Sequence, residues 1–234
     1  MLRTWLLTCV LAGTSLLAVE PNSLTEEEAA AGFQLLFDGQ SLTGWTIRGS
    51  DAIPENWIID AGALHRHGRG GSIASVATFS DFELRLQWKV AEGSNSGIFF
   101  RDDCAPNRQH RAHEMQVLDN ERHANGKDPL TSAGASYALY APSEDATRPV
   151  GEWNDVRIVA RGQQIEYWLN DVNVVSFEIG SEDWLARVAK SKFSKRDGFG
   201  LVPDGHIVLQ DHGDPVWFRS IRILDLSESP PGKN

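Results

Sequence analysis

The most regular pattern of hydrophobic and polar positions lies between Phe82 and Val90, where apolar residues occupy every second position. Charged and amide residues fill the positions between them. A period of two is that of a β-strand with one face on a core and the other toward solvent. Shorter stretches of the same kind, separated by residues typical of turns, recur along the chain. They predict further strands over residues 33–37, 57–59, 63–65, 96–101, 114–119, 153–160, 164–169, 172–177, 198–202, 206–211 and 216–224.

Two short segments have helical signals instead. Residues 23–32 begin with Ser23 and Thr25, either of which can cap a helix, and end at Gly32. Residues 181–188 follow the cap residue Ser181. Between the strands, residues 120–150 form a long loop rich in Gly, Pro, Asn and Ser, and loops of this length are usually functional or disordered. We expect this loop to form the wall of a cleft.

This succession of short strands predicts an all-β fold, a two-sheet antiparallel β-sandwich with one or two short peripheral helices. We expect residues 19–31 to form a lead-in that contains the first helix. Residues 32–226 are predicted to be a single sandwich domain, and residues 227–234 a flexible tail.

Residues 1–18 have the features of a secretory signal peptide. Arg3 supplies a positive flank, and residues 5–17 are apolar but too few to span a membrane. With cleavage after Ala18, the formal net charge changes from −10 to −11, because Arg3 is the only charged residue removed. This acidity argues against nucleic acid and anionic membranes as partners of the mature protein. We expect a secreted or periplasmic protein.

The chain has two cysteines, Cys9 and Cys104. Cys9 lies inside the predicted signal peptide, so a disulfide within the mature chain is excluded. We predict that Cys104 is a tolerated buried or loop thiol, with a nucleophilic role as the weaker alternative.

Polar side chains share one face on three predicted strands. Alternation places Arg101 on the first strand, Glu114 with Gln116 on the second, and Gln210 with His212 on the third. Burying such groups is costly unless they are paired, so their position favours a polar cleft lined by strands. Amides and a guanidinium suit sugar hydroxyls or a keto oxygen, and a carboxylate beside an imidazole suits proton transfer.

Each of these residues also has a simpler interpretation. Glu114 could be a solvated surface residue, Arg101 could pair with a neighbouring aspartate, and His212 could belong to a turn. The histidines at 65–67 and 110–113 have no firm metal-ligand spacing, so we assign no metal site, although a divalent ion remains an alternative. Trp57 is either a core residue or a platform on which a sugar stacks.

Several motifs occur in an order that resembles one family: FQLLFDG from Phe33, LTGW from Leu42, DFEL from Asp81, NSGI from Asn95, EMQVLDN from Glu114 and GHIVLQDHG from Gly205. The chain is similar, over roughly residues 32–226, to the bacterial 3-keto-disaccharide hydrolases. These are also described as 3-keto-glucoside 1,2-lyases and 3-keto-2-hydroxy-glucal hydratases. The resemblance implies a concanavalin-A-like jelly roll that acts on a small carbohydrate already oxidised by a separate glycoside 3-dehydrogenase. No nicotinamide cofactor is then required.

A ketone at C3 makes the C2 proton acidic, so a base can remove it while the C1 glycosidic oxygen leaves by β-elimination. Addition of water then completes a net hydrolysis. The chemistry requires a base, an acid for the leaving oxygen, and a cation or donors at the enolate. We predict Glu114 and His212 as the acid–base pair and Arg101 at the keto oxygen. The other predicted roles are sugar contacts for Gln116, Gln210, Asn95 and Trp57, and orientation of His212 or Arg101 for Asp119.

Two other functions remain open. A noncatalytic lectin-like carbohydrate-binding module could have the same fold, but lectin faces depend mainly on aromatics and amides. An ordinary glycosidase would need a second acid facing Glu114 at about 5–10 Å, and the alternation offers no obvious one.

Overall fold

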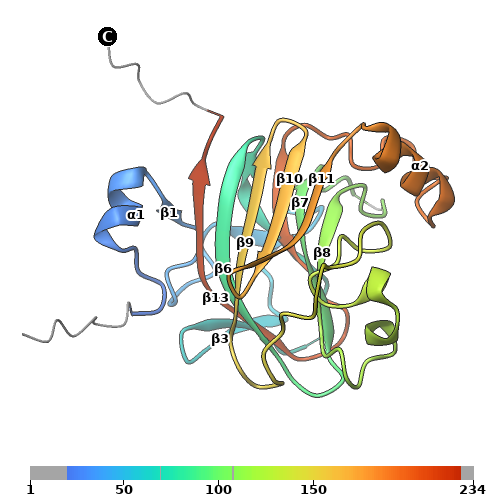
Figure 1. Ribbon diagram of the computed structural model, residues 1–234. Helices are drawn as coiled ribbons and strands as arrows, with labels where there is room; N and C mark the ends of the chain where they lie inside the picture. Colours follow the sequence, from blue (N-terminus) through green and yellow to red (C-terminus); the bar gives the residue numbers. More distant parts are fainter. Residues whose placement is uncertain (1–19, 69, 107, 228–234) are drawn as a thin grey trace, which may run out of the picture.

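The computed structural model describes residues 20–68, 70–106 and 108–227, which form two antiparallel sheets (Figure 1). The eight-stranded sheet has the order β11-β10-β9-β6-β13-β4-β3, with β1 paired to β13, and the five-stranded sheet has the order β2-β5-β12-β7-β8. The bounds are β1 Gln34–Leu35, β2 Trp45–Ile47, β3 Trp57–Asp60, β4 Ala63–Arg66, β5 Ile73–Phe79, β6 Phe82–Val90, β7 Asn95–Asp102, β8 His113–Leu118, β9 Asn154–Arg161, β10 Gln164–Leu169, β11 Val172–Glu178, β12 Gly205–Leu209 and β13 Val216–Asp225.

The all-β sandwich predicted from the sequence is confirmed, and the core lies between the two sheets. The apolar face of β6 contributes Phe82 and Trp88, which are 0% and 1% exposed. Phe100 of β7 meets both Phe82 and Tyr167 of β10 edge-on, so aromatic rings join the two sheets. The predicted signal peptide and residues 228–234 of the predicted tail lie outside the described residues.

Both predicted helices are present. Helix α1 (Glu26–Ala31) has a capping box between Thr25 and Glu28, and it ends at Gly32 with φ of 94°. Helix α2 (Glu182–Lys190) is capped by Ser181 and buries Trp184. Two short 3-10 helices (Ala124–Lys127 and Pro129–Thr131) lie in the long loop after β8.

The predicted strand over residues 198–202 is wrong, because the chain makes turns there. Gly198 and Gly200 both have φ of 69°, a backbone conformation that does not continue a strand. At Gly200 a Cβ atom would lie 2.5 Å from His113 Nε2 and 2.8 Å from Trp184, so glycine also permits close packing. The turns bring the segment after α2 back over the five-stranded sheet.

Trp57 is a core residue, and the prediction of a sugar-stacking platform is wrong. Its side chain is 1% exposed, it packs against Phe218, and its Nε1–H donates to the Gly71 carbonyl at 3.2 Å. In the residues that the structure describes, no helix has both the length and the apolar character needed to cross a membrane.

Candidate active site

A cavity of about 320 Å³ lies on the face of the five-stranded sheet that is turned away from the core. Its floor comes from β7, β8 and the end of β12. The long loop after β8 and the segment after α2 form its walls, so the loop is the cleft wall expected from the sequence. The described residues that line it are Asn95, Phe99, Gln109, His110, Ala112, Glu114, Gln116, Asn125, Tyr137, Lys192, Phe193, Arg196, Gln210 and His212.

Gly97 forms the centre of the floor. It is the register partner of Gln116 on β8, and on its other side its carbonyl accepts from the backbone N–H of Gln210 at 2.9 Å. A Cβ atom on Gly97 would lie 2.2 Å from Glu114 Oε1. The carboxyl of Glu114 therefore lies over the bare backbone of Gly97, in space that any side chain at residue 97 would fill.

The surroundings of Glu114 favour its neutral form. Burial raises the pKa of its carboxyl to about 8, although the positive charges of Lys192 and Arg196 pull it down. The carboxyl has no hydrogen-bond or salt-bridge partner among the described residues. At neutral pH Glu114 is therefore mainly a carboxylic acid that can donate a proton.

Three amide side chains bring hydrogen-bond acceptors to the same floor. The oxygens Asn95 Oδ1, Gln116 Oε1 and Gln210 Oε1 are buried, and none has a partner in the described structure. The nitrogen of Gln116 is held by the Thr131 carbonyl at 3.1 Å, which fixes the direction of its oxygen. Because buried polar atoms are normally paired, these oxygens suit a ligand rich in hydroxyl groups.

Arg101 does not reach the cavity, because a β-bulge interrupts the alternation of β7. Val208 of β12 faces Phe99, and His206 faces Asp102, so three residues of β7 span the length of two on β12. Arg101 itself has φ of 51°. Its guanidinium points elsewhere and donates to the Ser80 and Gly162 carbonyls at 2.6 and 2.9 Å. The predicted contact with a keto oxygen is therefore wrong.

The same bulge places Asp102 where alternation predicted Arg101. The Asp102 side chain is fully buried, and His110 Nδ1 lies 2.5 Å from its Oδ2. Burial acts to raise the pKa of Asp102, but hydrogen bonds from His110 and Arg48 outweigh it and lower the pKa to about 2. Because Asp102 is a carboxylate, His110 Nδ1 is the donor, and in the neutral ring Nε2 has the free lone pair.

His110 is held firmly in this position. Its ring stacks on Phe99 with centroids 3.9 Å apart and planes 8° apart, and Phe99 is the register partner of Glu114. The backbone carbonyl of His110 accepts from Arg196 Nη1 at 2.8 Å. The cavity therefore combines a neutral carboxylic acid with an imidazole oriented by a buried carboxylate.

His212 and Asp119 differ in their relation to the cavity. His212 lies at the rim with a side chain 48% exposed, and its nearest acid is Asp214 at 3.8 Å. Asp119 accepts from the backbone N–H groups of Gly93, Glu121 and Arg122, so it holds two turns. It contacts neither His212 nor Arg101, and the predicted orienting role is wrong.

Sequence reasoning missed His110, Lys192 and Arg196 as site residues. His110 was recognised only as one histidine of a group without metal-ligand spacing, and no signal in the sequence marks the bulge that gives it a carboxylate. Lys192 and Arg196 follow α2 by a few residues in a segment that has no regular structure. Lys192 Nζ lies 4.0 Å from the centre of the Tyr137 ring, so the two walls of the cavity meet there.

Neither the cysteine nor a metal-ligand cluster adds to the site. Cys104 is free and partly buried, and burial raises its pKa to about 12, which disfavours the thiolate that a nucleophile requires. Among the residues described, no group of three or more His, Cys, Asp or Glu side chains is placed to hold a metal ion.

Fold and cavity together define the class of protein: an all-β sandwich with an acid–base cavity on one sheet. Residues 32–224 match the model of the 3-keto-alpha-glucoside-1,2-lyase-like domain. The chain belongs to this family, as its motifs predicted, and the prediction that it is an enzyme is confirmed.

Relatives support the same assignment. A protein of Bacteroides thetaiotaomicron named 3-keto-disaccharide hydrolase is 32% identical over 245 residues, with 91% of this chain and 84% of that protein covered. Two crystal structures of Parabacteroides distasonis proteins, provisionally described as glycosyl hydrolases, are also similar. The first is 30% identical to this chain and has a TM-score of 0.83. The match covers 89% of this chain and 100% of that protein's chain. The second is 27% identical to this chain and has a TM-score of 0.69. The match covers 83% of this chain and 99% of that protein's chain.

Proposed function

We propose that this protein cleaves 3-keto-glycosides, 3-keto-disaccharides or glucosides, by β-elimination across C1 and C2 followed by hydration. The observation that supports it best is that one cavity holds both Glu114, whose carboxyl is mainly neutral at pH 7, and His110, whose imidazole is oriented by Asp102. A proton donor and a proton acceptor in one cavity are what concerted elimination requires. The substrate is a small carbohydrate supplied by a separate glycoside 3-dehydrogenase.

In the elimination, His110 Nε2 removes the proton from C2, and the resulting imidazolium is stabilised by Asp102. The C1–O bond breaks, and Glu114 donates its proton to the departing glycosidic oxygen. Negative charge that develops on the C3 oxygen is stabilised by Lys192 and Arg196, the cations of the cavity wall. These two residues take the role that the sequence had suggested for Arg101.

Hydration reverses the two proton transfers. The Glu114 carboxylate accepts a proton from water that attacks C1, and the His110 imidazolium returns its proton to C2. Both groups regain their starting states, so the net change is hydrolysis. The amide oxygens of Asn95, Gln116 and Gln210 accept hydrogen bonds from sugar hydroxyls and hold the ring over Gly97. His212, which the sequence suggested as the acid–base partner of Glu114, lies at the rim with its side chain 48% exposed, and in this proposal His110 takes its place.

An ordinary two-carboxylate glycosidase fits the cavity less well. Glu114 is the only acidic residue among the described residues that line it, and Asp102 lies behind His110 with both oxygens occupied. A lectin-like module has no need of a neutral carboxylic acid beside an oriented imidazole. A divalent ion that polarises the ketone would have to bind Glu114 and His110. Comparing cleavage with and without a chelator tests for such an ion.

The test gives the purified protein a 3-keto disaccharide and its parent sugar, with and without a chelator. Glucose release and the ultraviolet absorption of a conjugated enolone are followed. We expect cleavage of the keto sugar alone, reduced by about 100-fold or more in both Glu114→Gln and His110→Gln. Glu178→Gln, an exposed residue on β11, is the matched control and should retain full activity. Binding of both sugars without cleavage of either would establish the lectin-like alternative instead.

A further inference from the structure

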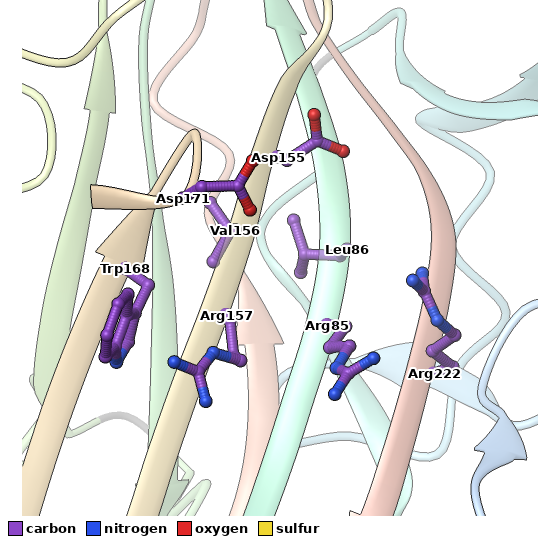
Figure 2. Close-up of a pocket in the computed structure, with 8 residues that line it drawn as sticks. All are labelled: Arg85, Leu86, Asp155, Val156, Arg157, Trp168, Asp171 and Arg222. Carbon is purple, nitrogen blue, oxygen red and sulfur yellow. The ribbon is translucent and has the colours of Figure 1, made fainter. Parts of the chain in front are cut away.

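A second hollow, of about 590 Å³, lies on the outer face of the other sheet (Figure 2). Three arginines and a tryptophan cross it in a single row. Trp168 on β10 faces Arg157 on β9, Arg157 faces Arg85 on β6, and Arg85 faces Arg222 on β13. None of these residues lines the cavity that contains Glu114, so the two sites belong to different sheets.

Like charges directly opposite one another on neighbouring strands are destabilising, so this row requires compensation. Arg85 and Arg222 have carboxylate partners that supply this compensation. Glu28 of α1 accepts from Arg85 at 3.0 Å and from Arg222 at 2.7 Å, and Arg85 also donates to Glu83 at 2.7 Å. These ion pairs attach helix α1 to the sheet, so Arg85 and Arg222 have a structural role.

Arg157 is different. No carboxylate of the described residues lies within 4 Å of its guanidinium, and none of its donors has a hydrogen-bond partner there. Its contact is with the face of Trp168, whose ring centre is 4.1 Å away. Trp168 Nε1 donates to Glu166 at 2.9 Å, which fixes the indole. The Arg157 guanidinium thus stacks on the indole inside the hollow and has no ion-pair partner among the described residues.

The opposite end of the hollow carries acceptors. Figure 2 shows Asp155 and Asp171 on one side of the arginine row. Asp155 is engaged by Gln87 and Arg148, whereas Asp171 is exposed and has no partner in the described part of the chain. A guanidinium, a partly exposed indole and free carboxylate oxygens lie together here. They suit a ligand with an anionic group, an apolar ring face and hydroxyl donors.

We propose that this hollow binds an acidic saccharide, an oligosaccharide of uronic acids. Its carboxylate pairs with Arg157 through two parallel N–H···O bonds, and its hydroxyl groups donate to Asp171. Salt screens the ion pair between this carboxylate and Arg157, so binding weakens as salt rises. The site lies apart from the catalytic cavity and does not depend on the proposed reaction.

The test measures binding of a galacturonic acid trimer, its methyl ester and a neutral glucose trimer to the purified protein by calorimetry at low salt. We expect the acid trimer to bind at least about tenfold more tightly than either uncharged sugar. The Arg157→Gln variant should bind the acid trimer no more tightly than the uncharged sugars. The Arg157→Lys variant should bind the acid trimer with intermediate affinity. Arg187→Gln removes an exposed arginine that pairs with Asp183 on α2, and as the matched control it should bind normally.

Several outcomes would overturn the proposal. They are absence of binding, equal binding of the acid and its ester, equal affinity of Arg157→Gln, or full competition by inorganic phosphate at the same concentration as the trimer. Loss of binding in Glu114→Gln but not in Arg157→Gln would place the acidic sugar in the catalytic cavity instead. Cleavage of the keto sugar by Arg157→Gln is measured alongside and should be unchanged, so failure of this site and failure of the proposed function give different results.

Discussion

At the scale of single residues, the candidate site depends on Gly97 as much as on Glu114. The absent side chain at residue 97 leaves the space in which the carboxyl lies, and the same surroundings raise its pKa to about 8. The position of the carboxyl thus depends on Gly97, and its protonation state depends on burial. Two substitutions test these two properties separately.

Gly97→Ala should reduce activity far more than stability. The new methyl group would lie 2.2 Å from Glu114 Oε1, so the end of the glutamate side chain must move, while the backbone at Gly97 is not in the left-handed region. We expect kcat/KM to fall by about 100-fold, since small displacements of a catalytic group cost that much. The melting temperature should change by only a few degrees. A large loss of stability with normal activity per folded molecule would contradict this account.

Glu114→Gln should become relatively more stable as the pH rises. The folded-state pKa of Glu114 is raised above its ordinary value of 4.5, so its contribution to stability is full below pH 4.5 and declines up to about pH 8. Glutamine keeps the neutral shape at every pH. At pH 9 the variant should therefore gain on the order of 4–5 kcal/mol over wild type relative to their difference at pH 4.

Denaturant unfolding of both proteins across this pH range is the measurement, with Glu178→Gln as the control. In the same range the kcat/KM of wild type should decline above about pH 8, as the general acid loses its proton. Parallel stability curves for wild type and Glu114→Gln would show that the carboxyl ionises normally.

At the scale of elements, β8 links the cavity to the core. Glu114 points into the cavity, while the preceding His113 points to the other side, beneath α2 and the segment that follows it. His113 is 2% exposed, packs against Phe177 and Phe199, and has no hydrogen-bond partner for either ring nitrogen in the described structure. Burial, with a smaller effect of the Arg101 charge, lowers its pKa to about 3.

His113→Phe should therefore make the protein more resistant to acid. The folded-state pKa lies below the ordinary 6.5, so the unfolded chain takes up a proton first, and stability declines as the pH falls from 6.5 toward 3. The loss amounts to about 3 kcal/mol by pH 4. Thermal melting from pH 7 to pH 4 should show a flatter profile for His113→Phe than for wild type. His67→Phe, at an exposed position, should follow wild type, and an equally flat profile there would contradict the explanation.

At the scale of the whole molecule, the two sheets carry different chemistry on their outer faces, and helix α1 is attached to β13 of the eight-stranded sheet. Figure 1 shows α1 beside β13, the first and last described elements. The link is Glu28, whose side chain is 8% exposed and bridges Arg85 and Arg222. Burial acts to raise its pKa, but the hydrogen bond from Arg222 and further partners outweigh that and lower it.

Glu28→Gln should destabilise the protein by about 1–3 kcal/mol, because it removes a charge that two arginines share and, among the described residues, leaves Arg222 without a carboxylate partner and Arg85 with Glu83 alone. The difference should shrink as the pH falls below 4.5, where the carboxylate of wild type becomes protonated as well. Glu27→Gln on the exposed side of α1 is the control. Keto-sugar cleavage should stay normal, and a loss of activity greater than the loss of folded protein would refute the separation of the two faces.

The sequence by itself determined the sandwich, both helices and the family, because these depend on local periodicity, cap residues and motifs along the chain. It also indicated Glu114, Gln116, Gln210 and His212 as residues of one face. Strand alternation is enough to predict a face wherever pairing is regular.

Only the tertiary structure decided which charged groups enter the cavity. A single extra residue in β7 turned Arg101 away from the cavity and placed Asp102 behind His110, and bulges depend on pairing with a neighbouring strand rather than on local sequence. The contributions of Lys192 and Arg196 depend on turns that fold a distant segment over the sheet. The row of Arg157, Arg85 and Arg222 likewise exists only because strands far apart in the chain pair in one register.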